Sequence, residues 1–485
     1  MNNKRDQEWR EALRKKMPAK DRAAIERVKM NELDPEERIK WLDKEVNMGL
    51  NKEQAVKEAS RCMDCINPTC IEGCPVNIDI PTFVKYIECE EFDKSIASLK
   101  ESNALPAVCG RVCPQEKQCE ANCFLQVKMK KEPVAIGYLE RFVADLERES
   151  GKRSVPVIAK ANGIKVATCG SGPASLSFAG DMAKFGYDVT VFEALHEIGG
   201  VLKYGIPEFR LPNSIVDFEI ENLKHLGVKF EKNFLLGRTS SFDDLRERGF
   251  KGFFIGSGAG LPNFMNIPGE NFNGVLSSNE YLTRVNLMKA SDECYDTPVF
   301  IGKRVAVIGG GNTAMDSVRI AKRLGAEAMI IYRRSREEMP ARVEEVKHAM
   351  EEGIVFMNLH NPTEYFADET GHVNKMRLQK MILGEPDASG RRRPVATDEF
   401  IDVDVDLVVV AIGVSPNPLI PMVEKDLEVT KWGTIVVDEV NNQTAVCDMF
   451  AGGDIVRGGA TVILAMGDGR KAAAGMNSYL EKGVK

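Results

Sequence analysis

The pattern of apolar positions divides the chain into a helical first part and a second part in which strands and helices alternate. From Asp34 the apolar residues recur at helical spacing, and the span 132–145 is predicted to be an amphipathic helix with an inward face of Ala135, Leu139, Phe142 and Val143. From Gly163 onward, short apolar runs alternate with helical stretches. Such alternation predicts parallel sheets covered by helices.

The first alternating unit carries a dinucleotide-binding fingerprint. A strand over Lys165–Cys169 precedes a glycine turn, a helix and a second strand over Val189–Glu193. The glycines permit a tight turn and close approach to a pyrophosphate, and the acid about 20 residues on is placed to bind ribose hydroxyls. The predicted ligands are Gly170, Gly172, Pro173, Ser175, Glu193 and Gly200.

A second fingerprint follows the predicted strand Arg304–Ile308, with Gly309, Gly311, Asn312 and Ala314 as candidate ligands. No acid ends the next strand. Arg333 and Arg334 follow Tyr332 instead. Two arginines at this position favour a 2′-phosphate and therefore predict NADPH rather than NADH.

Two strand-like runs, Phe253–Gly260 and Leu407–Asn417, bracket the second fingerprint, as expected if one dinucleotide domain is inserted into another. The glycine-rich loop near the end, with Gly453, Asp454 and Thr461, precedes a helix whose N-terminus can face a phosphate or an electron-rich ring. Between them, Asp387 and Gly390 predict a hairpin turn, and Arg391–Arg393 are interpreted as solvated. The expected domains are 1–155, 156–285, 286–413 and 414–485, the last completing the second.

Eight of the twelve cysteines lie in two short runs. The first is C-x2-C-x4-C-x3-C-P and contains Cys62, Cys65, Cys70 and Cys74; the second contains Cys109, Cys113, Cys119 and Cys123. Bacterial ferredoxins use a similar run, whose fourth cysteine serves the other of two clusters. A zinc site also uses C-x2-C pairs but closes at four ligands. The runs therefore predict paired iron–sulfur clusters. Cys89, Cys169, Cys294 and Cys447 are expected to be small packing residues.

Charge limits the classes of partner. The net charge of −7 argues against nucleic-acid binding, and no apolar run is long enough to span a membrane. Residues 1–30 nevertheless carry ten basic and five acidic side chains. We interpret this segment as a solvated helical arm, with docking of an acidic electron-transfer partner as the alternative. The charged start predicts no signal peptide, and grouped cysteines fit a cytoplasmic protein.

The chain resembles a known family in CMDCINPTCIEGCP, CGRVCPQEKQCEANC, GSGPASL, GGVLKYGIPEFRLP, GAGLPNFMNIPGEN, GGGNTAMD, YRRSREEMP and AGGDIVRGGATVILAMGDGRKAA. It is similar to the small (beta) subunit of NADPH-dependent glutamate synthase. The same group contains the large subunit of the electron-bifurcating NADH-dependent ferredoxin:NADP oxidoreductase and the sulfide dehydrogenase flavoprotein. The resemblance implies an all-α domain with two 4Fe–4S clusters, followed by two Rossmann-like α/β domains, with the NADPH domain inserted in the FAD domain.

The resemblance also implies how the ligands divide. One cluster would take Cys62, Cys65, Cys70 and Cys123, and the other Cys74, Cys113, Cys119 and a carboxylate that matches Glu140. Counting cysteines alone would use Cys109 instead, and an acid beside an apolar stripe is usually solvated. Following the resemblance, we predict Glu140 as the eighth ligand and Cys109 as a spare thiol, with the opposite assignment as the alternative.

The implied partner is a glutamate synthase large subunit, a smaller flavin and iron–sulfur subunit, or ferredoxin. With Met-Asn-Asn at the start and no FMN barrel, the chain is not expected to make glutamate alone. The alternatives are the subunit of the bifurcating transhydrogenase, and a zinc-containing docking module on a flavoprotein.

Overall fold

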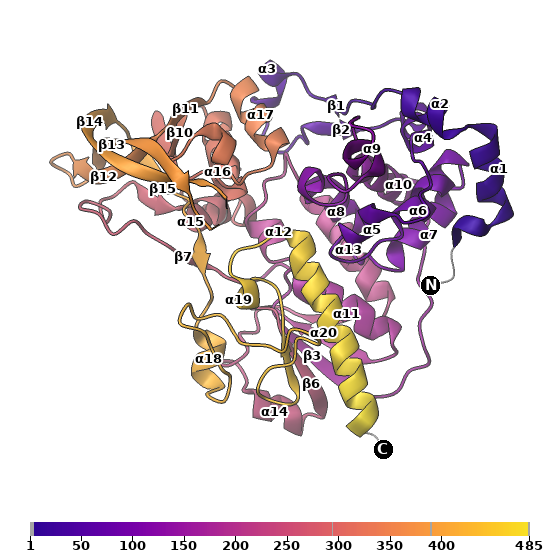
Figure 1. Ribbon diagram of the computed structural model, residues 1–485. Coiled ribbons are helices and arrows are strands. Elements are labelled where there is room, and N and C mark those ends of the chain that lie inside the picture. The colour runs from indigo at the N-terminus through magenta and orange to yellow at the C-terminus, as the bar shows by residue number, and fades with distance from the viewer. Residues whose placement is uncertain (1–3, 293, 389, 484–485) are drawn as a thin grey trace.

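The computed structural model describes residues 4–292, 294–388 and 390–483. The chain forms three parts: an N-terminal helical domain and two units built on parallel sheets (Figure 1). Among the described residues, no helix has both the length and the apolar character needed to cross a bilayer.

The helical domain confirms the first part of the expected fold, with one addition. Its helices are η1 (Lys4–Asp6), α1 (Glu8–Lys16), α2 (Ala19–Ala24), α3 (Pro35–Arg38), α4 (Lys52–Ser60), α5 (Thr69–Glu72), α6 (Ile80–Glu88), α7 (Phe92–Lys100), α8 (Pro106–Val112), η2 (Gln115–Lys117), α9 (Phe124–Val127) and α10 (Ile136–Ser150). A two-stranded antiparallel pair, β1 (Asn31–Glu32) and β2 (Asn47–Gly49), interrupts them. The helix predicted over 132–145 begins later and ends at Gly151, which caps it in the left-handed conformation.

The first parallel sheet has the order β17-β6-β3-β4-β5. Its strands are β3 (Lys165–Cys169), β4 (Asp188–Phe192), β5 (Lys229–Glu231), β6 (Phe250–Ile255) and β17 (Met449–Ala451). The accompanying helices are α11 (Pro173–Lys184), α12 (Val201–Tyr204), α13 (Asn213–His225), α14 (Phe242–Glu247), α18 (Leu419–Val423), α19 (Asp454–Arg457) and α20 (Val462–Gly483). The last strand and the last helix come from the chain's end, so this unit is assembled from two separate segments.

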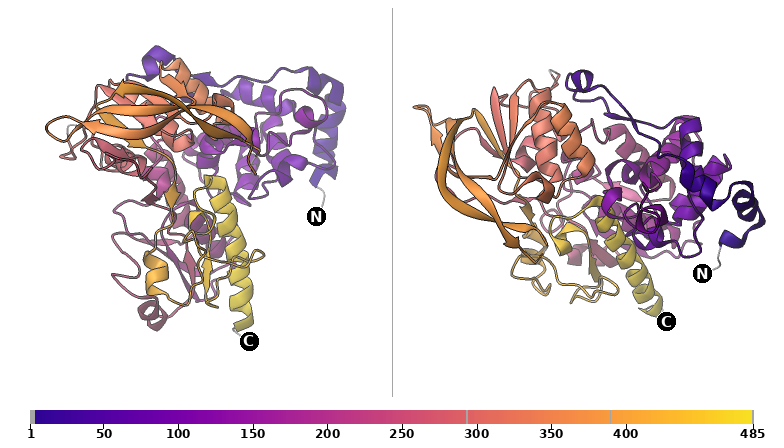
Figure 2. Two further views of the ribbon diagram at one scale, coloured as in Figure 1. Left: turned by 60° about the vertical axis from the view of Figure 1, so that its left-hand side comes forward. Right: turned by 45° about the horizontal axis from the view of Figure 1, so that its top comes forward.

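The second parallel sheet has the order β11-β10-β9-β15-β8. Its strands are β8 (Val275–Ser277), β9 (Arg304–Ile308), β10 (Glu327–Tyr332), β11 (Val355–Asn358) and β15 (Leu407–Val410), with α15 (Ser278–Leu282), η3 (Thr283–Leu287), α16 (Asn312–Arg323), η4 (Arg336–Glu338) and α17 (Val343–Glu351). An antiparallel sheet of β12 (His360–Ala367), β13 (Val373–Pro386) and β14 (Arg392–Asp404) lies on the side away from the helical domain (Figure 2). The predicted hairpin turn falls between β13 and β14.

The chain crosses between the two sheet units twice. The crossings pair as antiparallel β7 (Leu261–Pro262) and β16 (Val414–Ser415), which is where an inserted domain must leave and return. The returning strand β16 begins at Val414. On the outward side, β8 already pairs with β15 in the second sheet, ahead of the boundary predicted at 286.

The helical domain and the first sheet unit share one apolar core. Val108 and Leu139 of the former and Phe178, Met182 and Met466 of the latter belong to the same buried cluster. The second sheet unit has its own core around Val307 and Val318. Burial of apolar surface therefore joins the first two parts. The core of the third part also contains Val46 of the helical domain and Phe209 of the first sheet unit, so a smaller apolar contact reaches it as well.

Buried ion pairs add to the attachment of the second sheet unit. Arg210 of the first sheet unit donates to Asp316 of the second at 2.7 Å, and Arg38 of the helical domain lies 2.9 Å from Glu352. All four of these residues are buried. Removing one member of such a pair leaves an uncompensated buried charge, so these contacts fix the position of the second sheet unit.

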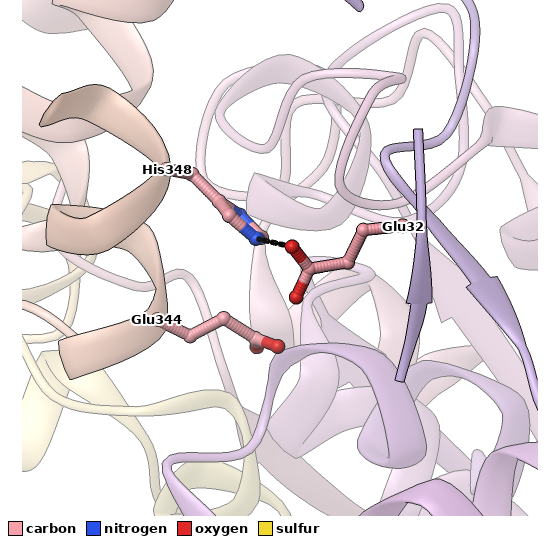
Figure 3. A group of neighbouring side chains, drawn as sticks. All are labelled: Glu32, Glu344 and His348. Carbon is pink, nitrogen blue, oxygen red and sulfur yellow. Dashed lines mark ion pairs between the residues drawn. The ribbon is translucent and has the colours of Figure 1, made fainter. Parts of the chain in front are cut away.

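A further polar contact at this interface joins β1 to α17. His348 Nε2 points to Glu32 at 3.4 Å, with Glu344 beside them (Figure 3). This contact, followed by the charges of His348 and Lys347, lowers the pKa of Glu32 to about 2 against the opposing effect of burial. Lys347 and Arg342 neutralise the two carboxylates at 3.3 and 3.0 Å, so the group acts as an interdomain ion-pair contact.

Candidate dinucleotide and iron–sulfur sites

The first fingerprint forms the tight turn that its glycines predict. Gly170 follows β3 with φ of +91°, and a Cβ there would lie 2.8 Å from the carbonyl oxygen of Gly256. Gly200 has φ of +55°, and its Cβ would lie 3.0 Å from the Cα of Gly172. Only glycine fits these approaches, which leave α11 to begin at Pro173 with its N-terminus facing the cavity.

Glu193 is buried at the end of β4, and it organises this turn. Its Oε2 accepts hydrogen bonds from the backbone N–H and the hydroxyl of Ser171, at 2.8 and 2.6 Å, and its Oε1 accepts one from Leu195 N–H at 2.8 Å. The side chain also lines the cavity. The predicted contact with ribose stays a prediction; the role of Ser171 as its partner was not predicted.

The C-terminal loop lies opposite this turn. Gly453 adopts φ of +79°, and Asp454 and Thr461 line the same cavity. Burial raises the pKa of Asp454 to about 6, although its carboxylate accepts a hydrogen bond from Ala460 N–H at 3.1 Å. Ser175, also predicted as a ligand, is fully buried on α11, and its hydroxyl occupies the space that a side chain at Gly256 would need.

The second fingerprint has the same construction. Gly309 has φ of +142°, and a Cβ there would lie 2.3 Å from the carbonyl oxygen of Ala411. Gly311 precedes α16, whose first turn contains the fully buried Ala314. Asn312 accepts a hydrogen bond from Arg342 N–H at 2.9 Å and lines the cavity.

The two predicted phosphate-binding arginines have different surroundings. Arg333 is exposed at the edge of the cavity. Arg334 is buried, pairs with Asp387 at 2.8 Å and donates to the carbonyl oxygen of Arg392 at 2.8 Å. Arg334 therefore fastens the β13–β14 turn beside the cavity, which leaves Arg333 as the exposed cation of the pair.

That turn also brings an unexpected cation to the cavity. Arg391 is half-buried and lines it, although the whole Arg391–Arg393 triplet was interpreted as solvated. Arg392 and Arg393 are exposed as expected. No local sequence signal identifies Arg391, because the turn that carries it lies more than fifty residues after Arg334 in the sequence.

Both fingerprints open into one cavity of about 1720 Å³. This exceeds the 300–1,000 Å³ that is typical of a site for one small ligand. Its lining includes the glycine turns of both units, the Gly453–Asp454 loop and Arg333. Two dinucleotides can therefore be bound in one continuous space, each at its own helix N-terminus.

The cysteines of the two runs form two groups. Cys62, Cys65, Cys70 and Cys123 line one small cavity of about 30 Å³ in the helical domain. Burial first, and then the neighbouring thiols, raise the pKa of Cys65 to about 12. All four are free thiols, which suits them to bind a metal cluster rather than to form a disulfide.

The second group contains Cys74, Cys113 and Cys119, with both candidates for the remaining ligand. A hydrogen bond with Cys109, then burial, and then the charges of Cys109, Glu140 and Cys74 raise the pKa of Cys113 well above its ordinary value. Burial, and then the charges of Glu120, Cys74 and Glu140, likewise raise the pKa of Cys119 well above its ordinary value. The fourth cysteine of the first run thus lies with the second group, as the resemblance implies.

Glu140 is buried rather than solvated. Burial raises its pKa to about 8, and its Oε1 accepts a hydrogen bond from Asn103 Nδ2 at 2.7 Å. Cys109 contacts Met466 of α20, with 3.5 Å between the sulfur atoms. Of the remaining cysteines, Cys169 is buried as expected, whereas Cys294 and Cys447 are exposed.

Comparison with known proteins agrees with an iron–sulfur domain followed by dinucleotide-binding units. Residues 38–152 match the family described as dihydropyrimidine dehydrogenase domain II, 4Fe-4S cluster, and residues 164–469 match pyridine nucleotide-disulphide oxidoreductase. The fold and the sites define an NADPH-dependent flavoprotein oxidoreductase with an iron–sulfur domain. The match of residues 38–152 to a 4Fe-4S family favours iron–sulfur clusters over a zinc site in the helical domain.

The chain belongs to the family of glutamate synthase [NADPH] small chains. It is 35% identical to the small chain of Azospirillum brasilense over 90% of this chain and 91% of that protein. The small chain of Escherichia coli K12 is 37% identical over 88% and 92%. The beta subunit of NADP(+)-dependent formate dehydrogenase from Moorella thermoacetica is 41% identical, but the match covers 86% of this chain and only 61% of that protein.

Solved structures agree at the level of the fold. FprA from Mycobacterium tuberculosis, in its His57Gln mutant, superimposes with a TM-score of 0.57 at 18% identity, over 67% of this chain and 86% of FprA.

Proposed function

We propose that the chain is the NADPH-linked electron-transfer subunit of an enzyme of the glutamate synthase type, with FAD at the first fingerprint, NADPH at the second and two 4Fe–4S clusters in the helical domain. The observation that carries the proposal is the single cavity shared by the two glycine turns. When bound, the flavin supplies two-electron hydride chemistry and the clusters supply one-electron transfer.

The chain's own residues would bind and orient these groups. The α11 N-terminus and the Gly453–Asp454 loop approach one dinucleotide, and the α16 N-terminus with Arg333 approaches the other. Cys62, Cys65, Cys70 and Cys123 would bind one cluster. Cys74, Cys113, Cys119 and Glu140 would bind the second, with Cys109 as an adjacent thiol. The need for free thiolates fits a reducing cytoplasm.

The test is anaerobic reduction of the purified protein. We expect NADPH to bleach the flavin absorbance and NADH to do so far less effectively, and we expect about eight irons per chain, as two cubane clusters require. A colourless protein, or one reduced equally well by both nucleotides, would contradict the proposal.

The partner protein is the second part of the proposal. Its identity would separate a glutamate synthase from a bifurcating transhydrogenase: the first requires a large amidotransferase subunit, and the second a small flavin and iron–sulfur subunit. Mass spectrometry of what co-purifies with the native protein distinguishes the two.

A further inference from the structure

The turn between β13 and β14 is held at the cavity by Arg334. The Nη2 of Arg334 donates to Asp387 Oδ2, and its Nε donates to the carbonyl oxygen of Arg392, both at 2.8 Å. Within the turn, Asp387 N–H donates to the carbonyl oxygen of Arg391 at 2.7 Å, and Arg391 N–H donates to Asp387 Oδ1 at 3.3 Å. These contacts close the turn and place Arg391 next to the residue that directly follows Arg333.

The three consecutive arginines of this turn have different surroundings. Arg391 is half-buried and lines the cavity. Arg392 is exposed, and its Nε donates to Glu338 Oε1 of η4 at 2.7 Å. Arg393 is exposed and lies outside the cavity lining. Of the triplet, Arg391 alone is therefore placed to contact a ligand in the cavity.

Positive charge is in excess where this turn meets the end of β10. Arg333 and Arg391 both line the cavity, although they come from segments far apart in the sequence. Together with Arg334 and its partner Asp387, they carry a formal charge of +2. A phosphate monoester carries about two negative charges near neutral pH, and the planar guanidinium group matches its oxygens in geometry. The group of charges therefore suits a phosphate monoester.

We propose that Arg391 is a specificity-determining residue that binds the 2′-phosphate of NADPH together with Arg333. The proposal rests on the function proposed above, in which the second fingerprint binds NADPH. In a dinucleotide-binding fold the pyrophosphate lies at the helix N-terminus, whereas the residue that ends the second strand contacts the 2′ position of the ribose. Arg391 lies with the latter, because its turn is fastened to Arg334.

Nucleotide selectivity is the property that tests this assignment. The adenine ring and the pyrophosphate occur in both NADPH and NADH, so a contact of Arg391 with either group would strengthen the binding of both nucleotides alike. A contact with the 2′-phosphate strengthens the binding of NADPH alone.

The first measurement is titration calorimetry of the intact, flavin-loaded protein with 2′,5′-ADP and with 5′-ADP, which differ only in the 2′-phosphate. We expect Arg391→Ala to bind 2′,5′-ADP about tenfold more weakly, as the loss of a hydrogen bond between charged groups implies, and to bind 5′-ADP within about twofold of the unmodified protein. Arg391→Lys keeps the charge without the planar fork, so its affinity should lie in between. Arg333→Ala/Arg391→Ala should bind the two nucleotides equally.

The second measurement is steady-state oxidation of NADPH and of NADH with an artificial electron acceptor. Arg391→Ala should raise KM for NADPH about tenfold and leave kcat unchanged, because the 2′-phosphate is remote from the reacting nicotinamide and contributes equally to the ground state and the transition state. KM for NADH should not change. A general loosening of the site would affect both nucleotides.

The matched control is Arg393→Ala, which removes the same charge two positions along the same turn from a side chain outside the cavity lining. We expect the control to bind 2′,5′-ADP and 5′-ADP like the unmodified protein. Equal weakening of both nucleotides in Arg391→Ala, or the same selective loss in Arg393→Ala, would overturn the assignment.

The unmodified protein separates this inference from the proposed function. If it prefers 2′,5′-ADP and Arg391→Ala keeps that preference, the inference about Arg391 fails and the proposed function stands. If the unmodified protein binds 5′-ADP as tightly as 2′,5′-ADP, the selectivity for NADPH in the proposed function fails as well.

Discussion

Replacement of Arg333 by alanine tests how the second dinucleotide site selects NADPH over NADH. The Arg333 side chain is exposed at the cavity edge directly after β10, whereas Arg334 is committed to Asp387 and Arg392. A hydrogen bond to a charged group contributes about 1.5–3 kcal/mol. Because Arg333 is exposed and screened by solvent, we expect about 1.5–2 kcal/mol, which is roughly a ten- to thirtyfold change in binding.

The assay is steady-state oxidation of NADPH and of NADH with an artificial electron acceptor. Arg333→Ala should raise KM for NADPH by roughly ten- to thirtyfold and leave KM for NADH unchanged, since only NADPH carries the 2′-phosphate. The control is Arg336→Ala, an exposed arginine on η4 that does not line the cavity. Equal losses with both nucleotides, or the same selective loss in the control, would refute the reasoning.

Arg334→Ala should act on stability instead. It removes a largely buried ion pair and a hydrogen bond to the β14 backbone, at a cost of about 2–3 kcal/mol. We expect a lower thermal unfolding temperature and a β13–β14 turn that is cleaved more readily by protease. A selective rise in KM for NADPH without loss of stability would instead assign the phosphate contact to Arg334.

Three further predictions, made with four substitutions, test the remaining sites. Glu140→Ala should abolish the signal of one cluster in electron paramagnetic resonance and lower the iron content, while Cys109→Ala should retain both; the opposite pattern would make Cys109 the ligand. Asp316→Asn leaves the buried Arg210 guanidinium with one carboxylate partner fewer and should lower stability by about 3 kcal/mol, measured by denaturant unfolding; an unchanged transition would exclude this pair as an interdomain contact. Because the pKa of Glu32 is lowered to about 2, its contribution to stability should be complete above its ordinary pKa near 4.5 and disappear as the pH falls toward 2. Glu32→Gln should therefore reduce the loss of unfolding free energy between pH 4.5 and pH 2. An unchanged pH dependence of stability in this range would show that Glu32 does not contribute to it.

Local patterns explain what could be predicted from the sequence. Each fingerprint is a strand, a glycine turn and a helix that are adjacent in the chain, so Gly170 and Gly309 were located without knowledge of the rest of the fold. In such motifs the sequence distance and the spatial distance are both short.

The features that were missed depend on long-range contacts. Arg391 looks like an ordinary basic residue, and Arg334 like a second phosphate ligand, until the β13–β14 turn folds beside the cavity. The basic arm looks solvated until Arg10 meets Asp64, more than fifty residues later in the chain. The burial of Glu140 depends on the packing of α10 against α8, which no periodicity within α10 reveals. Tertiary packing decided each of these cases.

The interface between the helical domain and the first sheet unit differs from the interface that attaches the second sheet unit, and the difference suits the proposed function. In the proposed function, electrons pass between the first sheet unit and the helical domain, and the shared apolar core that includes Cys109, Phe178 and Met466 holds these two parts at a fixed separation. In the same proposal, the second sheet unit admits and releases a nucleotide at the shared cavity. The attachment of this unit combines ion pairs such as Arg210–Asp316 with the apolar side chains of Val46 and Phe209, in a core separate from the one that the other two parts share. A small displacement of this unit would therefore disturb the nucleotide site and leave the packing between the other two parts intact.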